Sequence, residues 1–240
     1  MKIWKSEYTH IGGKKINEDA FVSRELTEQS VFAAVADGLE DLGNGKLAAQ
    51  IVIKNLTQCG MCSILPTEFQ IRNWFQGANL EIQAKGRGAA GMRSTAVFLA
   101  VFHGCAVWAH SGDSRLYHFH DGQIRNSTND HSVPQMKVAA GEMTRNEIPF
   151  SPDRNKVLKA LGTADWEPEI APAIRLQPGR HAFLLCTDGF WEYLTDEEIW
   201  LDLNKSVSPA AWLNYLRCRG ESRKSENADN NTAVAIFVDV

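Results

Sequence analysis

The feature that most constrains this chain is a set of short runs that are apolar on both faces. They are TAVFLAVF (95–102), VFAAVA (31–36), HAFLLC (181–186) and TAVAIFV (232–238). Because a β-strand alternates its side chains between two faces, such runs predict strands in sheets that are covered on both sides. With 240 residues, 44% of them hydrophobic, we expect one domain over 1–240.

Further elements follow from local patterns. TAVFLAVF, CAVWAH (105–110) and RLYHF (115–119) are joined by short connections, which predict antiparallel neighbours. Residues 66–85 carry apolar side chains at helical spacing. Thr195 and Glu198 form a capping box, and Ser208-Pro209 is typical of a helix start. We therefore expect two amphipathic helices between the last two strands.

The segment 126–178 is polar and contains six prolines. It lacks strong strand patterns and predicts an insertion of helix and loop on the body of the domain. Such insertions often form flaps that face a substrate.

Charge and composition exclude several functions. The net charge is −4 without a basic cluster, which argues against a nucleic-acid partner. No run approaches the roughly 20 apolar residues of a membrane span, and the N-terminus does not resemble a signal peptide, so we expect a cytoplasmic protein. Five scattered cysteines fit a reducing compartment. We interpret Cys59 and Cys62 in CGMC as packing residues rather than a redox or zinc site.

Acidic residues stand where apolar runs end. These residues are Glu18, Asp19, Asp37, Asp113, Asp188 and Asp229. Each alone is typical of a turn or helix cap, but together they would place several like charges at one sheet edge, which cations must stabilise. Hard divalent ions such as magnesium or manganese prefer such all-oxygen ligands. The glycines after Asp37 and Asp188 allow tight turns and close backbone approach.

The ordered motifs NED, ADG, GDSR, CTDGFWEYLTDEEI and DNNT span almost the whole chain. In this order they resemble the metal-dependent type-2C Ser/Thr protein phosphatases, the PPM family, in their compact bacterial form. NDHSVPQMKVAAGEMT and RNKVLKALG resemble the flap of bacterial members. The resemblance implies an α/β fold, a four-layer sandwich of two central antiparallel β-sheets flanked by helices on both faces. It also implies hydrolysis of phosphoserine and phosphothreonine on proteins, opposing a partner Ser/Thr kinase in bacterial signalling.

The resemblance further implies two divalent ions, manganese or magnesium, and assigns as their ligands Glu18, Asp19, Asp37, Gly38, Asp188 and Asp229. Asp37 would bridge both ions, and the Gly38 carbonyl would bind one of them. The last two aspartates would complete the first ion, and the acidic residues of NED would support the second directly or through water. Asp113 with Asp188 matches a third, weaker metal. A water between two metals becomes a hydroxide nucleophile near neutral pH.

The chain departs from the family pattern at several positions. Lys14 stands where the family has a phosphate-binding arginine, so we expect it to bind phosphate with weaker orientation. Leu39 replaces a histidine proposed as general acid, which leaves solvent or a metal-bound water to protonate the leaving group. Glu40 and Asp41 are either extra ligands or a solvated loop, and we favour the loop. Arg93 replaces a glycine of GMGTT.

These departures keep alternatives open. The leading hypothesis is a monomeric phosphatase whose catalytic residues include Asp37, Asp188 and Lys14, acting on a phosphorylated protein, a cognate kinase or its target. The alternative is a catalytically weak or inactive relative that acts as a phosphoprotein-binding regulatory module. A third hypothesis, unrelated structural aspartates, would require five ordered motifs to match by chance.

Overall fold

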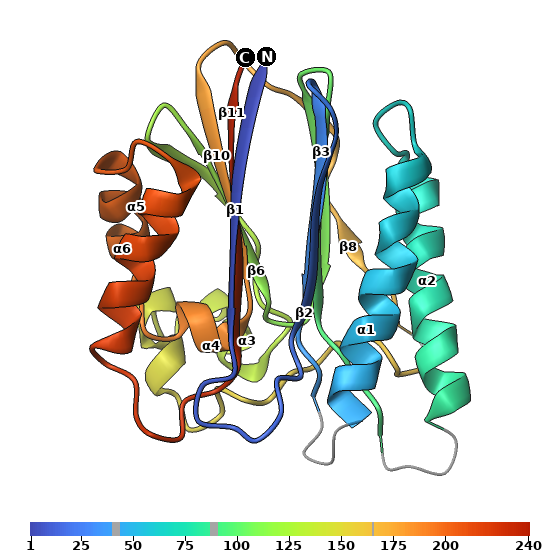
Figure 1. The fold of residues 1–240 in the computed structure, drawn as a ribbon. Coiled ribbons are helices and arrows are strands. Elements are labelled where there is room, and N and C mark those ends of the chain that lie inside the picture. Colours follow the sequence, from blue (N-terminus) through green and yellow to red (C-terminus); the bar gives the residue numbers. More distant parts are fainter. Residues whose placement is uncertain (40–43, 87–90, 165) are drawn as a thin grey trace.

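The computed structural model describes residues 1–39, 44–86, 91–164 and 166–240. Two antiparallel sheets face each other, and helices cover the outer face of each sheet (Figure 1). This arrangement confirms the four-layer sandwich that the motifs predict. Both chain termini lie at one end of the sandwich (Figure 1).

The first sheet contains strands from both ends of the chain. Its order is β1 (Lys2–His10), β11 (Asn231–Asp239), β10 (Arg180–Cys186), β6 (Arg115–His120) and β7 (Gln123–Ser127). All of its neighbouring pairs are antiparallel. Strands β10 and β11 lie inside the sheet and are buried along almost their whole length, which explains why they are apolar on both faces.

The second sheet corrects one prediction. Its order is β2 (Ala20–Thr27), β3 (Ser30–Ala36), β4 (Ala96–Phe102), β5 (Cys105–Ser111) and β8 (Glu169–Ile170), while β9 (Ile174–Arg175) also pairs with β5. β4 and β5 are antiparallel neighbours as expected. RLYHF, however, is β6 of the first sheet, so the prediction that it neighbours CAVWAH is wrong. The connection turns at Gly112, at φ +96°, and crosses between the sheets, while β8 and β9 occupy the free edge of β5.

Most of the helices form the outer layers (Figure 1). The described residues contain α1 (Asn44–Leu56), η1 (Thr57–Met61), α2 (Glu68–Lys85), α3 (Val133–Ala139), η2 (Arg145–Phe150), α4 (Asp188–Trp191), α5 (Asp196–Asn204) and α6 (Pro209–Glu221). The Thr195 and Glu198 capping box is present at α5, and the Ser208 hydroxyl accepts a hydrogen bond from the Ala211 N–H at the start of α6. The two helices predicted between the last strands are therefore confirmed, with the short α4 before them.

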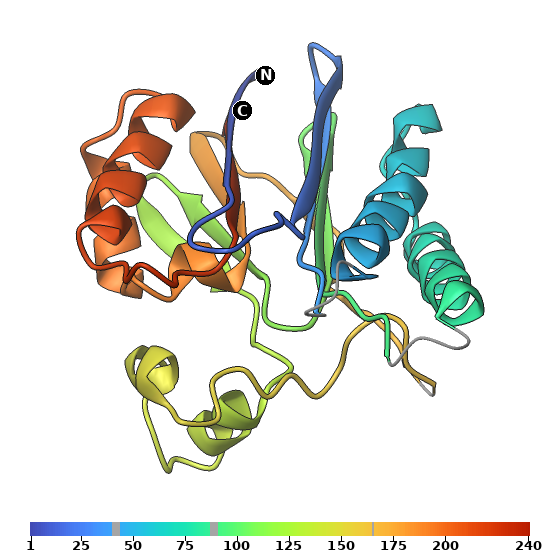
Figure 2. The ribbon, with the colours of Figure 1, turned by 60° about the horizontal axis from the view of Figure 1, so that its bottom comes forward.

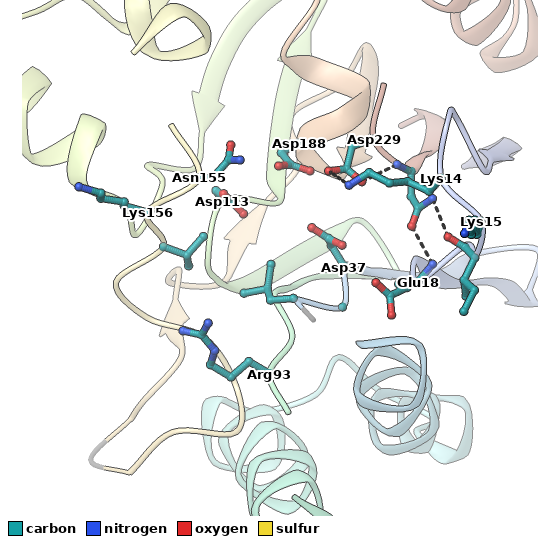
Figure 3. Close-up of a pocket in the computed structure, with 15 residues that line it drawn as sticks. Lys14, Lys15, Glu18, Asp37, Arg93, Asp113, Asn155, Lys156, Asp188 and Asp229 are labelled. Atoms are coloured by element: carbon teal, nitrogen blue, oxygen red, sulfur yellow. Dashed lines mark hydrogen bonds and ion pairs between the residues drawn. The ribbon is translucent and has the colours of Figure 1, made fainter. Parts of the chain in front are cut away.

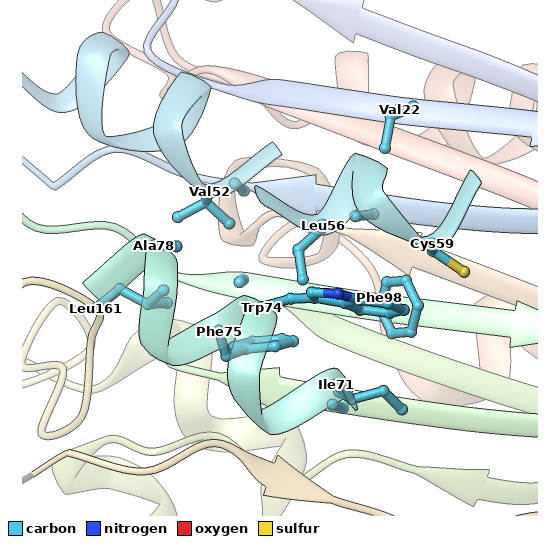
Figure 4. Close-up of a cluster of buried hydrophobic side chains, with 14 of the residues drawn as sticks. Val22, Val52, Leu56, Cys59, Ile71, Trp74, Phe75, Ala78, Phe98 and Leu161 are labelled. Atoms are coloured by element: carbon cyan, nitrogen blue, oxygen red, sulfur yellow. The ribbon is translucent and has the colours of Figure 1, made fainter. Parts of the chain in front are cut away.

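Three apolar clusters hold the layers together. One lies between the sheets and includes Phe183 and Ile236. Another packs α1 and α2 on the second sheet around Trp74 and Phe98 (Figure 4). The third packs α5 and α6 on the first sheet. Cys59 is fully buried in the α1 and α2 cluster, where burial raises the pKa of its thiol, and Cys62 is partly buried against the same cluster, so both residues pack as predicted.

Residues 126–178 include α3, η2, and the two-residue strands β8 and β9, which the sequence did not indicate. The α3 and η2 part extends from the end of the sandwich that is opposite to the chain termini (Figures 1 and 2). Its action as a flap stays a prediction. Among the described residues, no helix combines the length and apolar composition needed to cross a membrane.

A buried histidine pair ties β6 to β10. The Nε2 atom of His118 lies 2.9 Å from Nδ1 of His181, and Nε2 of His181 lies 2.9 Å from the Gln177 carbonyl oxygen. A carbonyl only accepts, so His181 carries its proton on Nε2 and accepts from His118 through Nδ1. Burial lowers the pKa of His118 to about 3, and the nearby His181 acts in the same direction.

The lowered pKa of His118 predicts acid sensitivity. In the unfolded chain His118 has an ordinary pKa of about 6.5 and binds a proton below that pH, whereas in the folded chain it stays neutral down to about pH 3. The free energy of unfolding therefore decreases as the pH falls below about 6.5. Between pH 7.5 and 5.0, the free energy of unfolding of His118→Phe should fall by about 2 kcal/mol less than that of wild type. Denaturant unfolding at both pH values measures this. His103→Asn, at an exposed turn, is the control, and equal pH dependence in all three proteins would contradict the prediction.

Candidate metal centre

Strand ends from both sheets meet in an open pocket of about 810 Å³ (Figure 3). Its lining includes the predicted residues Lys14, Glu18, Asp37, Gly38, Asp113, Asp188 and Asp229. Asp19 does not line the pocket, but its carboxylate accepts a hydrogen bond from the Thr187 hydroxyl (3.0 Å) next to Asp188. The structure therefore brings together acidic residues that are up to 211 positions apart in the sequence, from Glu18 to Asp229.

Asp37 is held where β3 ends. Its N–H donates to the Thr95 hydroxyl (3.1 Å), and its carbonyl accepts from the Thr95 N–H (2.8 Å). The Thr95 hydroxyl also contacts the Ser114 hydroxyl at 2.7 Å, which links Asp37 to the loop that carries Asp113. These bonds fix the backbone and leave the carboxylate directed into the pocket (Figure 3).

Both Asp-Gly pairs need glycine because another chain segment comes very close. A Cβ atom on Gly38 would lie 2.1 Å from the Gly45 carbonyl oxygen at the start of α1. A Cβ atom on Gly189 would lie 2.1 Å from the Asn230 carbonyl oxygen. Real Cβ contacts are never this short, so each glycine allows the segment behind it to pack against the site.

Asn230 is a residue that the sequence did not single out beyond the DNNT motif. Its Oδ1 accepts from the Glu18 N–H (2.8 Å), and its amide donates to the carbonyls of Ile11 (2.7 Å) and Ile16 (3.0 Å). It therefore ties the loop that carries Lys14 and Glu18 to the start of β11. No local pattern distinguishes such a role from that of a turn asparagine.

The Asp113 loop depends on partners that the sequence also missed. The buried Arg115 donates from Nε and Nη2 to the two carboxylate oxygens of Asp130 (2.8 and 2.7 Å) and stacks 3.3 Å from the ring centroid of Trp191. The Trp191 Nε1–H donates to the Asp113 carbonyl (2.9 Å). The only available signal was the arginine of GDSR.

His131 fixes the turn before Asp113. Its backbone N–H donates to the Gly112 carbonyl (2.8 Å), and its ring Nδ1 accepts from the Gly112 backbone N–H (3.2 Å). Its ring stacks on the buried His110 at 4.5 Å between centroids, and its Nε2 contacts Glu169 at 3.2 Å. Residues after β7 thus hold a residue of the pocket in place.

The carboxylates are costly to keep charged together. Burial, followed by the charge of Asp188, raises the pKa of Asp37 well above its ordinary value. Burial, followed by the charge of Asp113, does the same to Asp188. Burial is also the main cause that raises the pKa of Asp19 and of Asp113 to about 7. Asp113 Oδ1 is buried and has no hydrogen-bond partner within the described residues. Such oxygens fit cations.

The donor set favours hard ions. Five acidic residues and Gly38 line the pocket, and its described lining contains no histidine or cysteine. Magnesium and manganese take ligands of this kind, whereas zinc sites use nitrogen and sulfur more often. The residues therefore fit the divalent ions that the resemblance implies.

Cationic side chains also line the pocket. Lys14 Nζ lies 3.1 Å from Asp229 Oδ2, and in Figure 3 Arg93 and Lys156 lie on the other side of Asp37. Leu39 also lines the pocket, and its N–H donates to the Arg93 carbonyl (3.0 Å). The predictions for Glu40 and Asp41 lie outside the described residues.

Repulsion among the pocket carboxylates predicts the stability of an Asp37→Asn variant with and without metal. In EDTA the variant should be more stable than wild type, because it removes one of several crowded charges. Manganese at 100 times its dissociation constant should stabilise wild type by about 2.7 kcal/mol, and the variant should lose most of this gain. Thermal and denaturant unfolding measure both effects. Asp239→Asn, paired with Arg180 outside the pocket, should keep the wild-type response to metal, and equal responses of Asp37→Asn and wild type would disprove the assignment.

Comparison with known proteins identifies the family. The family described as Protein phosphatase 2C matches residues 7–220. The putative protein phosphatase 2C-type of Streptococcus pyogenes serotype M6 is 30% identical over 216 residues, which cover 87% of this chain and 86% of that protein. Among solved structures, the serine/threonine phosphatase Stp1 from Staphylococcus aureus has a TM-score of 0.86 and 26% identity, covering 100% of this chain and 98% of that one.

A further structure, the catalytic domain of the serine/threonine protein phosphatase PstP in complex with two manganese ions, has a TM-score of 0.83 at 24% identity. It covers 99% of both chains and shares the fold. The family match spans most of the sequence and includes the pocket residues from Lys14 to Asp188. The chain belongs to the protein phosphatase 2C family, as its ordered motifs predicted.

Proposed function

We propose that this protein phosphatase removes phosphate from phosphoserine and phosphothreonine of proteins, and that the carboxylate pocket is its active centre. The observation that carries the proposal is the convergence of five acidic residues from distant strand ends in one open pocket, where the carboxyl pKa values of Asp37, Asp113 and Asp188 are raised. The names of the relatives support a Ser/Thr phosphatase, and they give no support to an inactive regulatory module.

The pocket residues suit two divalent ions, manganese or magnesium. Glu18, Asp37, the Gly38 carbonyl, Asp188 and Asp229 line the pocket and would hold them, with Asp19 in support. Asp113, with its unsatisfied oxygen, would serve a third ion together with Asp188. Bound ions of this type neutralise phosphoryl oxygens and lower the pKa of water for in-line attack. The protein's own contribution is to hold the carboxylates in position through hydrogen bonds to the backbone beside them, such as those at Asp37 and Asp113.

We infer that Lys14 binds the substrate phosphate. Its ammonium group contacts Asp229, it lines the pocket, and about 45% of its side chain is exposed, so an incoming phosphate can reach it. A lysine provides charge but not the planar pair of donors of an arginine. Leu39 cannot donate a proton, so water protonates the leaving alkoxide.

The finer features of the substrate and cell context are also proposals. The substrate is a phosphorylated protein, and we infer that it is a cognate Ser/Thr kinase or a target of that kinase. We infer a monomer of one domain over 1–240 in which 126–178 forms a flap beside the pocket. The five thiols are all unpaired, which supports a reducing, cytoplasmic location.

Metal-dependent turnover tests the function. Wild type should hydrolyse p-nitrophenyl phosphate and a phosphothreonine peptide with manganese, and EDTA should abolish both activities. Asp188→Asn should lose at least a hundredfold in kcat on both substrates, because a ligand charge is removed. Activity that survives EDTA would refute the metal mechanism, and no manganese-dependent activity in wild type would favour the regulatory module.

Lys14→Ala tests the phosphate contact. Loss of a charge-assisted hydrogen bond should lower kcat/KM on the phosphothreonine peptide by about 10- to 100-fold. Lys14→Arg should keep or improve it because the guanidinium can bind phosphate with two donors. Lys15→Ala changes a neighbouring lysine of the same lining and is the matched control. Unchanged kinetics of Lys14→Ala would remove this residue from the mechanism.

A further inference from the structure

Arg93 stands out among the cations of the pocket. It lines the pocket and is half-buried, yet its guanidinium has no hydrogen bond or ion pair within the described residues. Placing an arginine charge in a partly buried position without a partner costs solvation energy. Such a group is well suited to pair with an anion that comes from outside the chain.

The backbone around Arg93 holds it in place. Its carbonyl accepts from the Leu39 N–H (3.0 Å). The next residue, Ser94, exchanges two hydrogen bonds with Leu161 (3.1 and 2.8 Å) and forms a β-bridge with Gly38. Arg93 is therefore fixed between the Asp37 strand end and the segment that returns from α3 and η2, and little backbone entropy is lost when an anion binds.

The other cations of the lining have different surroundings. Lys14 pairs with Asp229 and lies on the opposite side of Asp37 (Figure 3). Lys156 lies on the same side as Arg93, but its ammonium group pairs with Asp153 at 2.8 Å and two thirds of its side chain is exposed. Among the described residues of the lining, Arg93 thus provides the main available positive charge on its side of the pocket, with Lys156 as a weaker, solvated companion.

We propose that Arg93, assisted by Lys156, forms a second anion subsite that selects substrates with an acidic group, a carboxylate or a second phosphate, close to the phosphorylated residue. The inference rests on the proposed function, because it assumes that the scissile phosphate sits at the carboxylate centre near Asp37. A guanidinium offers planar paired donors that match both carboxylate and phosphate. The subsite concerns recognition and takes no part in bond cleavage.

The test compares matched phosphothreonine peptides with manganese-loaded enzyme. One peptide has neutral neighbours, a set carries a single Asp at each position from −3 to +3, and a last one carries a second phosphothreonine. p-Nitrophenyl phosphate, which has no neighbouring residues, reports the carboxylate centre alone. The variants are Arg93→Ala, Arg93→Lys and Lys156→Ala. The control is Arg24→Ala, which also removes one positive charge but lies on β2, where Arg24 is exposed and outside the pocket.

We expect at least one Asp position, or the second phosphate, to raise wild-type kcat/KM about tenfold over the neutral peptide, mainly through KM. Arg93→Ala should remove this preference and leave p-nitrophenyl phosphate and the neutral peptide within twofold of wild type. Arg93→Lys should keep part of the preference for the acidic peptides, and Lys156→Ala should reduce this preference slightly. Arg24→Ala should keep the full preference. Added salt should weaken the preference because the subsite is partly open to solvent.

Two results would overturn the subsite. One is a wild type that does not discriminate among the peptides while it hydrolyses all of them. The other is an Arg93→Ala variant that loses the same factor on every substrate, which would indicate a structural role instead. Absence of manganese-dependent hydrolysis of p-nitrophenyl phosphate by wild type would instead refute the proposed function. The peptide comparison distinguishes whether a carboxylate or a phosphate is preferred.

Discussion

Repulsion among carboxylates at one end of the sandwich is the constraint on which the rest of the structure depends. The charges of Asp188 and Asp113 both raise the pKa of Asp37, and the charge of Asp113 also raises the pKa of Asp188. A flexible site would relieve this repulsion by moving the side chains apart. The protein prevents this with hydrogen bonds to the backbone beside each carboxylate, such as those from Thr95 to Asp37 and from Trp191 to Asp113. The fold therefore maintains a charge arrangement that cations complete.

Close backbone contacts explain how so many strand ends fit into one site. The glycine after Asp37 touches the first turn of α1, and the glycine after Asp188 touches the segment of Asp229 and Asn230. Neither contact leaves room for a Cβ atom. Each Asp-Gly pair thus has a double role: the aspartate supplies a carboxylate, and the glycine admits the backbone of a neighbouring segment. Substitution of either glycine would displace more than one residue of the pocket.

The sequence predicts the parts of the fold whose signal is local. β3, β4, β10 and β11 are buried on both faces and are apolar over most of their length, so their strands could be recognised from composition alone. β1 is a polar edge strand that is fixed by pairing with β11 from Lys2 to His10, and no periodic pattern reveals it. The acidic residues were predicted from their positions and from the family resemblance. Asn230 and Asp130 were not, because their importance lies in long-range hydrogen bonds.

The pocket also depends on the distance between the sheets. Asp37 follows a strand of one sheet, whereas Asp188 and Asp229 flank strands of the other. The spacing between them is set by fully buried side chains such as Leu99, Phe183 and Ile236, which leave no space for the sheets to slide or approach. The same burial makes the strands apolar on both faces. Two of the apolar runs, 31–36 and 181–186, therefore lead directly to Asp37 and Asp188, and the packing that requires these runs also positions the predicted metal ligands.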